Sequence, residues 1–163
     1  RWKIYQGKES SLYDGSDDSY VWYDPDGDSN STNDDALVND FIGYDFGKVA
    51  TLEKIHIVVG NDSGDKLQEY AIETSLNNNE WTAIDGYADY NGKQSGKDII
   101  DISVDRLKAR YIRIRNLKQQ GSWLKFSEFT VQEFQPVVGT TEYLLQMLII
   151  HLFYLEWKME KLI

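Results

Sequence analysis

Short stretches in which apolar and polar residues alternate recur along most of this chain, and they restrict the folds open to it. Ile55 and Ile57, for example, alternate with Lys54 and His56. A period of two residues is typical of β-strands, and Gly, Asn, Asp and Ser separate the stretches as turn residues do. The stretches are Phe41–Phe46, Leu52–Val59, Tyr70–Leu76, Glu80–Ile84, Asp98–Val104, Ala109–Arg115 and Leu124–Phe134. With no amphipathic helix among them, they predict an all-β, antiparallel β-sandwich whose loops cluster at two ends.

Length and composition exclude several classes of function. The 163 residues suffice for one domain, or for one domain with a short appendage. Lys and Arg number 17 against 27 Asp and Glu, which gives a net charge of −10. Without a cationic surplus, we expect neither nucleic acid nor an anionic membrane surface as a partner. The absence of cysteine excludes disulfides, thiolate zinc sites and cysteine nucleophiles, and His56 and His151 are the only histidines.

The two ends of the chain differ in composition from its middle. No apolar leader follows Arg1, and the abrupt start indicates a fragment of a larger protein. We expect a lead-in or linker over residues 1–7, a folded module over 8–136 that ends at Pro136, and an apolar tail over 137–163. The most apolar part, Leu144–Trp157, is shorter than the about 20 residues that span a membrane, so no membrane insertion is expected. Two interpretations of the tail stay open: a helix, and a non-native extension such as a frameshifted read-through.

Acidic residues are concentrated in one part of the chain. Between Asp14 and Asp45, ten of 32 positions are Asp and none is Lys or Arg. Such a run is usually a solvated surface, but Tyr20–Tyr23 interrupts it with four aromatic or apolar residues. The combination favours ordered loops in which a bound cation neutralises some of the carboxylates.

The densest acidic cluster begins with a tight turn at Asp14-Gly15. A carbonyl two residues further on, at Ser16, and a hydroxyl five residues further on, at Ser19, could surround the same point as the Asp14 carboxylate. Oxygen donors without His or Cys are the ligands that Ca²⁺ prefers. The alternative is an ordinary Asp-Gly turn with solvated acids.

Five segments of the chain carry motifs that occur together in one known family of domains. They read SSLYDGSDDSYVW, FIGYDFG, EWTAI, ARYIRI and KFSEF, and they begin at positions 10, 41, 80, 109 and 125. In this order they resemble the discoidin, or coagulation factor 5/8 type C, domains over about residues 8–134. Within that group the chain looks most like the family 32 carbohydrate-binding modules appended to secreted bacterial hyaluronidases and β-N-acetylglucosaminidases. The resemblance implies a discoidin-like jelly-roll β-sandwich, and it does not extend to the tail.

The same resemblance implies one structural calcium ion that connects the early loop to the last strand. By position, the ligands would be the Asp14 and Glu128 carboxylates and the hydroxyl and carbonyl of Ser19. Backbone carbonyls would complete the shell, from Ser11, Ser16 and Ser127. The residues themselves agree, because Glu128 is an acid within an apolar run and an ionised carboxylate there needs a partner.

A second acidic cluster has weaker metal-binding character. Asp24, Asp26 and Asp28 have the spacing of the start of an EF-hand loop. Gly27 stands at the fourth instead of the sixth place, however, and Asp35 replaces the bidentate Glu at the twelfth. A second calcium ion and a solvated acidic loop are therefore both compatible with this cluster.

Sugar recognition requires a flat aromatic surface together with a few polar groups, and three loop regions offer both. The candidate sugar-binding residues are Trp22, Tyr23, Asn61, Asp62, Asn116, Lys118 and Trp123. Trp123 is the one that matches the family by position, although an aromatic residue that covers the core is the alternative. Trp81 is expected in the core, and Tyr87 and Tyr90 are secondary candidates. In some members of the family that the chain resembles, a loop histidine contacts galactose. His56 lies within a predicted strand, so the resemblance favours a sugar of the N-acetylglucosamine type over galactose.

These observations predict a non-catalytic, calcium-stabilised carbohydrate-binding module. It would hold a parent secreted glycosidase on host glycans of N-acetylglucosamine or galactose type, so we expect a secreted or cell-surface location. One alternative is a glycoside hydrolase that uses a carboxylate pair, separated by about 5–5.5 Å in retaining enzymes. Another is a protein- or lipid-binding discoidin module, which would use exposed apolar and basic residues.

Overall fold

The computed structural model of the chain describes residues 2–28, 35–60, 65–121 and 123–136. The tail over 137–163 and the candidate residues Asn61 and Asp62 lie outside the described residues. One short 3₁₀ helix and ten strands make up the fold of these described residues. They are β1 (Lys3–Gln6), η1 (Glu9–Leu12), β2 (Val21–Asp24), β3 (Asp35–Ala36), β4 (Phe41–Val59), β5 (Glu69–Ser75), β6 (Thr82–Ala83), β7 (Tyr90–Asn91), β8 (Asp98–Asn116), β9 (Gln120–Gly121) and β10 (Leu124–Glu133). No helix among these residues is long and apolar enough to cross a membrane.

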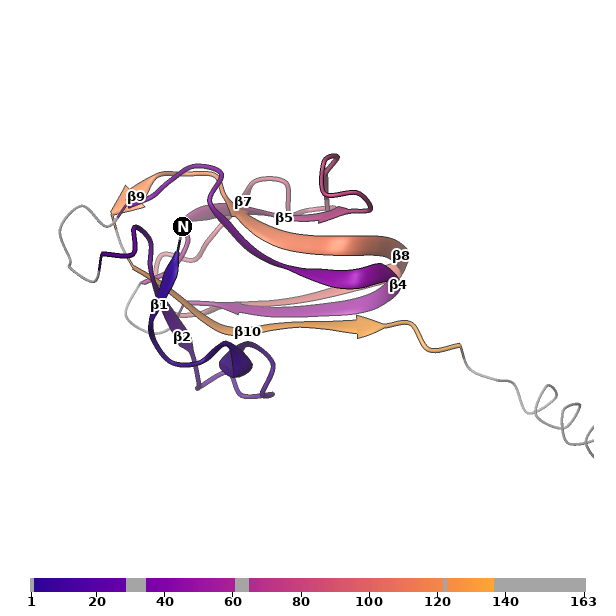
Figure 1. Ribbon diagram of the computed structural model, residues 1–163, viewed down its shortest axis with the longest axis horizontal. Helices are drawn as coiled ribbons and strands as arrows, with labels where there is room; N and C mark the ends of the chain where they lie inside the picture. Colours follow the sequence, from indigo (N-terminus) through magenta and orange to yellow (C-terminus); the bar gives the residue numbers. More distant parts are fainter. Residues whose placement is uncertain (1, 29–34, 61–64, 122, 137–163) are drawn as a thin grey trace, which may run out of the picture.

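The strands form an antiparallel sandwich, which confirms the predicted fold class. Eight strands belong to one sheet with the order β1-β2-β10-β4-β8-β5-β6, and β7 pairs with β5. This sheet folds over itself into two layers (Figure 1). The upper layer contains β5 and the adjoining halves of β4 and β8, and the lower layer contains β10, β2 and the other halves of β4 and β8. A separate small sheet pairs β3 with β9.

Strands β4 and β8 are longer than the alternation of residues predicts. Each is 19 residues long and joins two stretches that we expected to be separate strands. The pairing between them shifts register from Asp45 to Ala50, and Gly47 and Arg106 have positive φ values of 72° and 52°. Such irregularities bend a strand without ending it. The β4–β8 hairpin therefore bends as a unit and passes from one layer to the other.

The core lies between the two layers. Ile57 of the lower layer and the paired Ile72 and Ile114 of the upper layer belong to one core cluster and are fully buried. On β10, Phe126 and Phe129 both point into the core although they are three residues apart. Strict alternation would place them on opposite faces. A register shift between Phe126 and Glu128 resolves this conflict, because it adds one residue to β10 relative to β4.

Strand β1 lies within the first seven residues, which the sequence assigned to a lead-in. It pairs with β2 in antiparallel fashion from Lys3 opposite Asp24. Just before it, Trp2 packs on the core residue Phe126, with ring centroids 6.2 Å apart. The N-terminal residues therefore form one edge of the lower layer.

Candidate functional site

The irregularity in β10 determines where the Glu128 carboxylate lies. Because Phe126 and Phe129 both occupy the core, Glu128 is directed toward the turn that follows η1. It is only 2% exposed, yet its Oε1 atom accepts a hydrogen bond of 2.9 Å from the backbone N–H of Ser16. Glu128, the acid within the apolar run, thus contacts the Asp14 turn.

The turn itself is organised around the Asp14 carboxylate. Its Oδ1 atom accepts the N–H of Ser16 at 2.9 Å, and its Oδ2 atom accepts the hydroxyl of Ser19 at 2.7 Å. Gly15, with φ of 78°, allows the backbone to turn this tightly. The turn therefore gathers Asp14, Ser16 and Ser19 around one point, together with Glu128.

The two remaining predicted calcium residues lie next to this group. Ser127 precedes Glu128, is 1% exposed, and its Oγ atom has no hydrogen-bond partner among the described residues. Ser11 belongs to η1, where its N–H donates to the carbonyl of Lys8. The structure thus brings four of the six predicted residues into contact and places the other two on the adjoining backbone.

The electrostatics of this site are those of two carboxylates close together. Burial raises the pKa of Glu128, and the neighbouring Asp14 carboxylate raises it further. The hydrogen bond from the Ser19 hydroxyl lowers the pKa of Asp14. Asp14 is therefore stabilised as an anion beside a buried acid that resists ionisation. A cation between them would remove this conflict.

A second set of contacts supports the same turn, and sequence analysis did not predict it. The His56 ring on β4 lies between two acids, with Nδ1 2.7 Å from Asp101 and Nε2 3.3 Å from Asp17. The ammonium of Lys97 donates to the backbone carbonyl of Asp17 and pairs with the Asp18 carboxylate at 3.2 Å. Burial lowers the pKa of His56, but the hydrogen bonds with Asp101 and Asp17 outweigh it and raise the pKa overall.

The second acidic cluster is organised as a hydrogen-bonded turn. Carboxylate oxygens of Asp24, Asp26 and Asp28 lie within 4.8 Å of one another. Asp24 accepts the N–H groups of Asp26 and Gly27, and Asp26 accepts that of Asp28. Lys3 donates to the Gly27 carbonyl at 2.8 Å. These contacts account for the cluster as a turn, and the side chain of Asp35 lies outside the described part of the structure.

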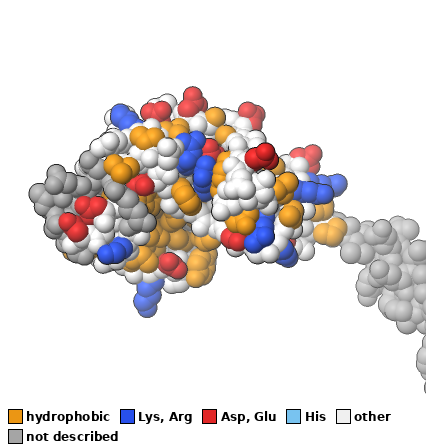
Figure 2. Space-filling view, turned by 45° about the horizontal axis from the view of Figure 1, so that its top comes forward, with side chains coloured by type: hydrophobic (Ala, Val, Ile, Leu, Met, Phe, Trp, Pro, Cys, Tyr) orange, Lys and Arg blue, Asp and Glu red, His pale blue; other side chains and the backbone are white. Residues whose placement is uncertain are grey.

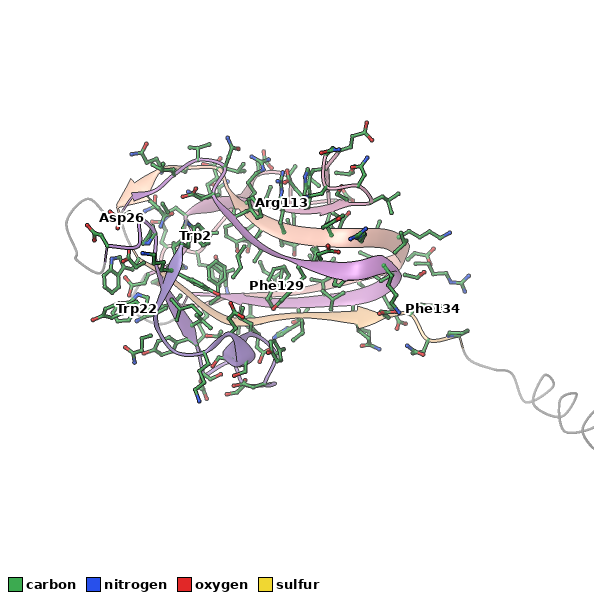
Figure 3. The ribbon with its side chains drawn as sticks, in the orientation of Figure 1. Trp2, Trp22, Asp26, Arg113, Phe129 and Phe134 are labelled. Carbon is green, nitrogen blue, oxygen red and sulfur yellow. The ribbon has the colours of Figure 1, made fainter. Side chains whose placement is uncertain are left out.

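Two of the predicted sugar-binding aromatics meet at one end of the sandwich. The rings of Trp22 and Trp123 contact each other edge to face, with centroids 4.9 Å apart. Tyr5 of β1 joins them, 5.3 Å from Trp22 and 4.2 Å from Trp123, and is 50% exposed. The ammonium of Lys125 lies 4.2 Å from the Trp22 ring. Figure 3 shows Trp22 at the end of the sandwich where Trp2 and Asp26 also lie. We call Tyr5, Trp22 and Trp123 the aromatic cluster.

Tyr23 and Asn116 occupy supporting positions instead of the direct sugar contact expected from the sequence. Tyr23 alternates with Trp22 on β2, so its ring points into the core and only 8% of the residue is exposed. Asn116 is fully buried, and its amide donates to the carbonyls of Ala36 and Leu37. Both are therefore corrections to the predicted binding surface. Lys118, in contrast, is exposed.

Trp81 does not belong to the core, contrary to expectation. It is half-buried on the upper layer, where the Arg113 guanidinium lies 3.8 Å from its ring centroid. Arg113 and Arg115 also pair with the carboxylate of Glu73. Figure 2 shows this side of the molecule, where basic and hydrophobic side chains lie side by side. The tilted ring of Tyr111 lies 6.3 Å from that of Trp81.

A cavity of about 660 Å³ lies away from all the predicted site residues. It is lined by residues of β5, β6 and β8 and the adjoining turns, among them Leu76, Ile84, Ile102 and Leu107. The secondary candidates Tyr87 and Tyr90 stack on each other at 5.3 Å and pack against the core. Neither feature belongs to the aromatic cluster or to the Asp14 turn.

The folded-over sheet, with a turn held against its last strand and candidate binding residues in its loops, defines a discoidin-like β-sandwich domain. A family model, the F5/8 type C domain, matches residues 3–129, and the chain belongs to this family. The resemblance stated from the motifs is thereby confirmed. No curated protein matches the chain significantly.

Solved structures share this fold at low sequence identity. The first carbohydrate-binding module of family 32 from a Clostridium perfringens family 31 glycoside hydrolase aligns with a TM-score of 0.58 at 20% identity, over 80% of this chain and 89% of that one. The family 32 module of Clostridium perfringens NanJ, solved in complex with galactose, gives 0.52 at 17% identity, over 80% and 91%. A chitosan-binding module of a Paenibacillus chitosanase/glucanase gives 0.52 at 18% identity, over 80% and 92%.

Proposed function

We propose that this chain is a non-catalytic carbohydrate-binding module of the family 32 type. The aromatic cluster supports this proposal most directly. It combines an exposed tyrosine with two half-buried tryptophans at one end of the sandwich. Aromatic rings bind the apolar faces of sugar rings, and neighbouring polar groups hold the hydroxyls. Of the similar modules named above, one comes from a glycoside hydrolase and one from a chitosanase/glucanase, and the third was solved with galactose.

Two indole groups in the cluster supply a further reason. The Nε1 atoms of Trp22 and Trp123 are buried and have no hydrogen-bond acceptor among the described residues. A buried donor without an acceptor costs about 1–3 kcal/mol. Hydroxyl groups, from a sugar or from water within the cluster, would satisfy these donors.

In this proposal the module holds a parent secreted glycoside hydrolase on host glycans, with sugars of the N-acetylglucosamine or galactose type. Weak binding by one module suffices for this role, because several modules on one chain bind with a high effective concentration. The location would be secreted or cell-surface. The parent enzyme supplies the catalysis, and this domain supplies only the attachment.

Structural calcium is part of the same proposal. Asp14, Ser19 and Glu128 would hold the ion through side-chain oxygens, and carbonyls of Ser11, Ser16, Ser19 and Ser127 would complete the shell. The residues fit such an ion, because two carboxylates and a hydroxyl converge and no nitrogen or sulfur side chain of the described residues is recorded among them. When bound, calcium would join the early turn to the last strand. The ion would thereby stabilise the fold without taking part in sugar chemistry.

A hydrolase that uses the Asp14 and Glu128 carboxylates is the weaker candidate. Glu128 is 2% exposed and is held by the N–H of Ser16, so it could not reach a glycosidic bond without unfolding the turn. Lipid binding is also less favoured, because a chain of net charge −10 is repelled by an anionic membrane surface.

A glycan array, probed with the full chain with and without a chelator, tests the proposed function. We expect binding to glycans that carry terminal N-acetylglucosamine or galactose, and weaker or less stable binding after chelation. Aryl glycosides of the same sugars should release no chromophore. Turnover that is lost on substitution of a carboxylate would favour the hydrolase, and binding to anionic liposomes without any glycan signal would favour the lipid-binding module.

A further inference from the structure

A small pocket lined by lysines lies beside the segment that carries Trp123. Its volume is about 230 Å³, and Lys66, Lys93 and Lys118 line it together with one acid, Glu69. Pockets for whole drug-sized ligands span about 300–1,000 Å³, so this one has the size for a single charged or polar group. Three cations against one carboxylate are unexpected in a chain whose net charge is −10.

The backbone that carries Lys93 is fixed by a buried ion pair. Asp98 is fully buried and accepts hydrogen bonds from the backbone N–H of Lys93 at 2.8 Å and from the hydroxyl of Tyr70 at 3.1 Å. The ammonium of Lys66, itself 4% exposed, lies 3.5 Å from Asp98 and donates to the carbonyl of Gly96 at 2.8 Å. This wall of the pocket is therefore held in one geometry.

The wall that carries Lys118 is hydrogen-bonded to the segment that contains Lys66 and Glu69. The N–H of Leu117 donates to the Glu69 carbonyl, and the N–H of Lys118 donates to the side chain of buried Asn116. The amide of Gln120 connects the Lys66 carbonyl, at 2.6 Å, with the N–H of Gln68, at 2.8 Å. Both lysine-bearing walls are thus preorganised by buried polar contacts.

The charges of the three lysines are compensated unequally. Asp98 compensates Lys66, whereas the ammonium groups of Lys93 and Lys118 have no recorded acceptor or acidic partner among the described residues. Glu69 offsets one of these two cations, so the pocket keeps a net positive charge, which the low-dielectric walls make more effective. An anion in the pocket would neutralise the remaining positive charge and could accept charge-assisted hydrogen bonds from Lys93 and Lys118.

We propose that this lysine pocket binds the anionic group of an acidic saccharide, so that the module recognises glycans that contain a uronic acid or a sulfate ester. The inference rests on the proposed function and narrows its ligand class. Lys118 and Trp123 flank the short strand β9 and are at most about 18 Å apart along the backbone, so one oligosaccharide of several sugars can contact both the aromatic cluster and the pocket. Asn91 and Gln94 at the same pocket offer amides for the neighbouring hydroxyls.

The test compares neutral and acidic probes on two variants of the full chain. The probes are chito-oligosaccharides, their 6-O-sulfated forms, oligosaccharides of alternating N-acetylglucosamine and glucuronic acid, and neutral galactose-terminated glycans. The variant Lys93→Gln/Lys118→Gln removes the two uncompensated cations. The control Lys48→Gln/Lys54→Gln changes the net charge equally at two exposed lysines away from the pocket.

We expect the acidic probes to bind the unmodified chain at least about tenfold more tightly than the neutral ones, with an affinity that falls as salt is raised. The pocket variant should lose this preference and keep its melting temperature, and the control should retain the preference. Comparison of the sulfated probes with the probes that contain glucuronic acid shows which anion the pocket prefers. Equal affinity for neutral and acidic probes, or equal losses in the two variants, would overturn the inference and leave the proposed function intact. Absence of binding to every glycan would instead overturn the proposed function and the inference with it.

Discussion

The buried carboxylate of Glu128 and the exposed carboxylate of Asp14 accept the same backbone N–H, that of Ser16, each at 2.9 Å. One belongs to the last strand of the sheet and the other to a turn near the start of the chain. Because this single contact joins two distant parts of the sequence, whatever strengthens it should stabilise the whole domain.

Calcium should therefore raise the stability of the domain. At a free concentration 100-fold above Kd, linkage predicts about 2.7 kcal/mol. For a domain of this size that corresponds to a rise in Tm of roughly 5–10 °C. Differential scanning calorimetry with calcium and with a chelator measures the shift. Asp14→Asn should abolish the calcium response, whereas Asp45→Asn, at an exposed acid paired with Arg110, should retain it. An unchanged Tm in the presence of calcium would refute the proposed ion site.

Tyr5→Ala should separate sugar binding from stability. Half of Tyr5 is exposed, so removal of its ring should lower glycan affinity by about tenfold, or about 1.4 kcal/mol, with little change in Tm. Trp123→Ala should lower affinity at least as much and also cost about 1–2 kcal/mol of stability, because its ring packs between Tyr5 and Trp22. Isothermal titration calorimetry and thermal unfolding measure the two effects. Phe41→Ala, at an exposed aromatic of β4 outside the cluster, is the control. If Tyr5→Ala bound glycans normally, the aromatic cluster would not be the site.

The ion pairs of Glu73 should make part of the stability depend on pH. Burial alone would raise the pKa of Glu73, but hydrogen bonds from Arg115 and Arg113 outweigh it and lower the pKa. A carboxyl with a lowered pKa in the folded state stabilises the protein above its ordinary pKa, and this contribution is lost as the pH falls through the lowered value. Glu73→Gln should thus cost about 2–3 kcal/mol at pH 7 and progressively less below about pH 4.5. Urea unfolding at pH 7 and at a pH below about 4.5 measures this cost in the free energy of unfolding. A penalty that does not change with pH would contradict this account.

The stabilisation by His56 should depend on pH with the opposite sign. Its pKa is raised overall by Asp101 and Asp17, so its stabilisation is complete below the ordinary value of about 6.5 and is lost as the pH rises through the raised value. We expect His56→Gln to destabilise the domain at pH 5.5 by about 0.5–1 kcal/mol and to have little effect at pH 9. Titration of the His56 imidazole by NMR gives the pKa directly. A value at or below 6.5 would show that the two acids do not stabilise its cation.

The local pattern of residues was sufficient to predict the class of fold and the core of one candidate site. Alternation placed the long strands β4, β5, β8 and β10, because a strand with one buried face must alternate wherever it pairs regularly, but it did not predict β1 or β2. The turn around Asp14 was predictable for a similar reason, since Asp, Gly and Ser at short spacing determine their own hydrogen bonds within a few residues. The sequence also placed Trp22 and Trp123 among the candidate sugar-binding residues, but it did not predict that their rings meet, because Trp22 lies on β2 and not in a loop.

The tertiary structure decided which side chains those elements expose and which partners they meet. Tyr23 and Asn116 are buried because of the face on which each lies, and that face depends on strand pairings far away in the sequence. Tyr5 joins the tryptophans only because β1 pairs with β2, and Glu128 reaches Asp14 only because β10 carries an extra residue opposite β4. Periodicity along a chain records whether a residue alternates with its neighbours, whereas burial and charge compensation depend on contacts between distant segments. The lysine pocket belongs to this second kind of information, because its walls come from the start of β5 and the residues just before it, from β7 and the loop after it, and from the segment before β9.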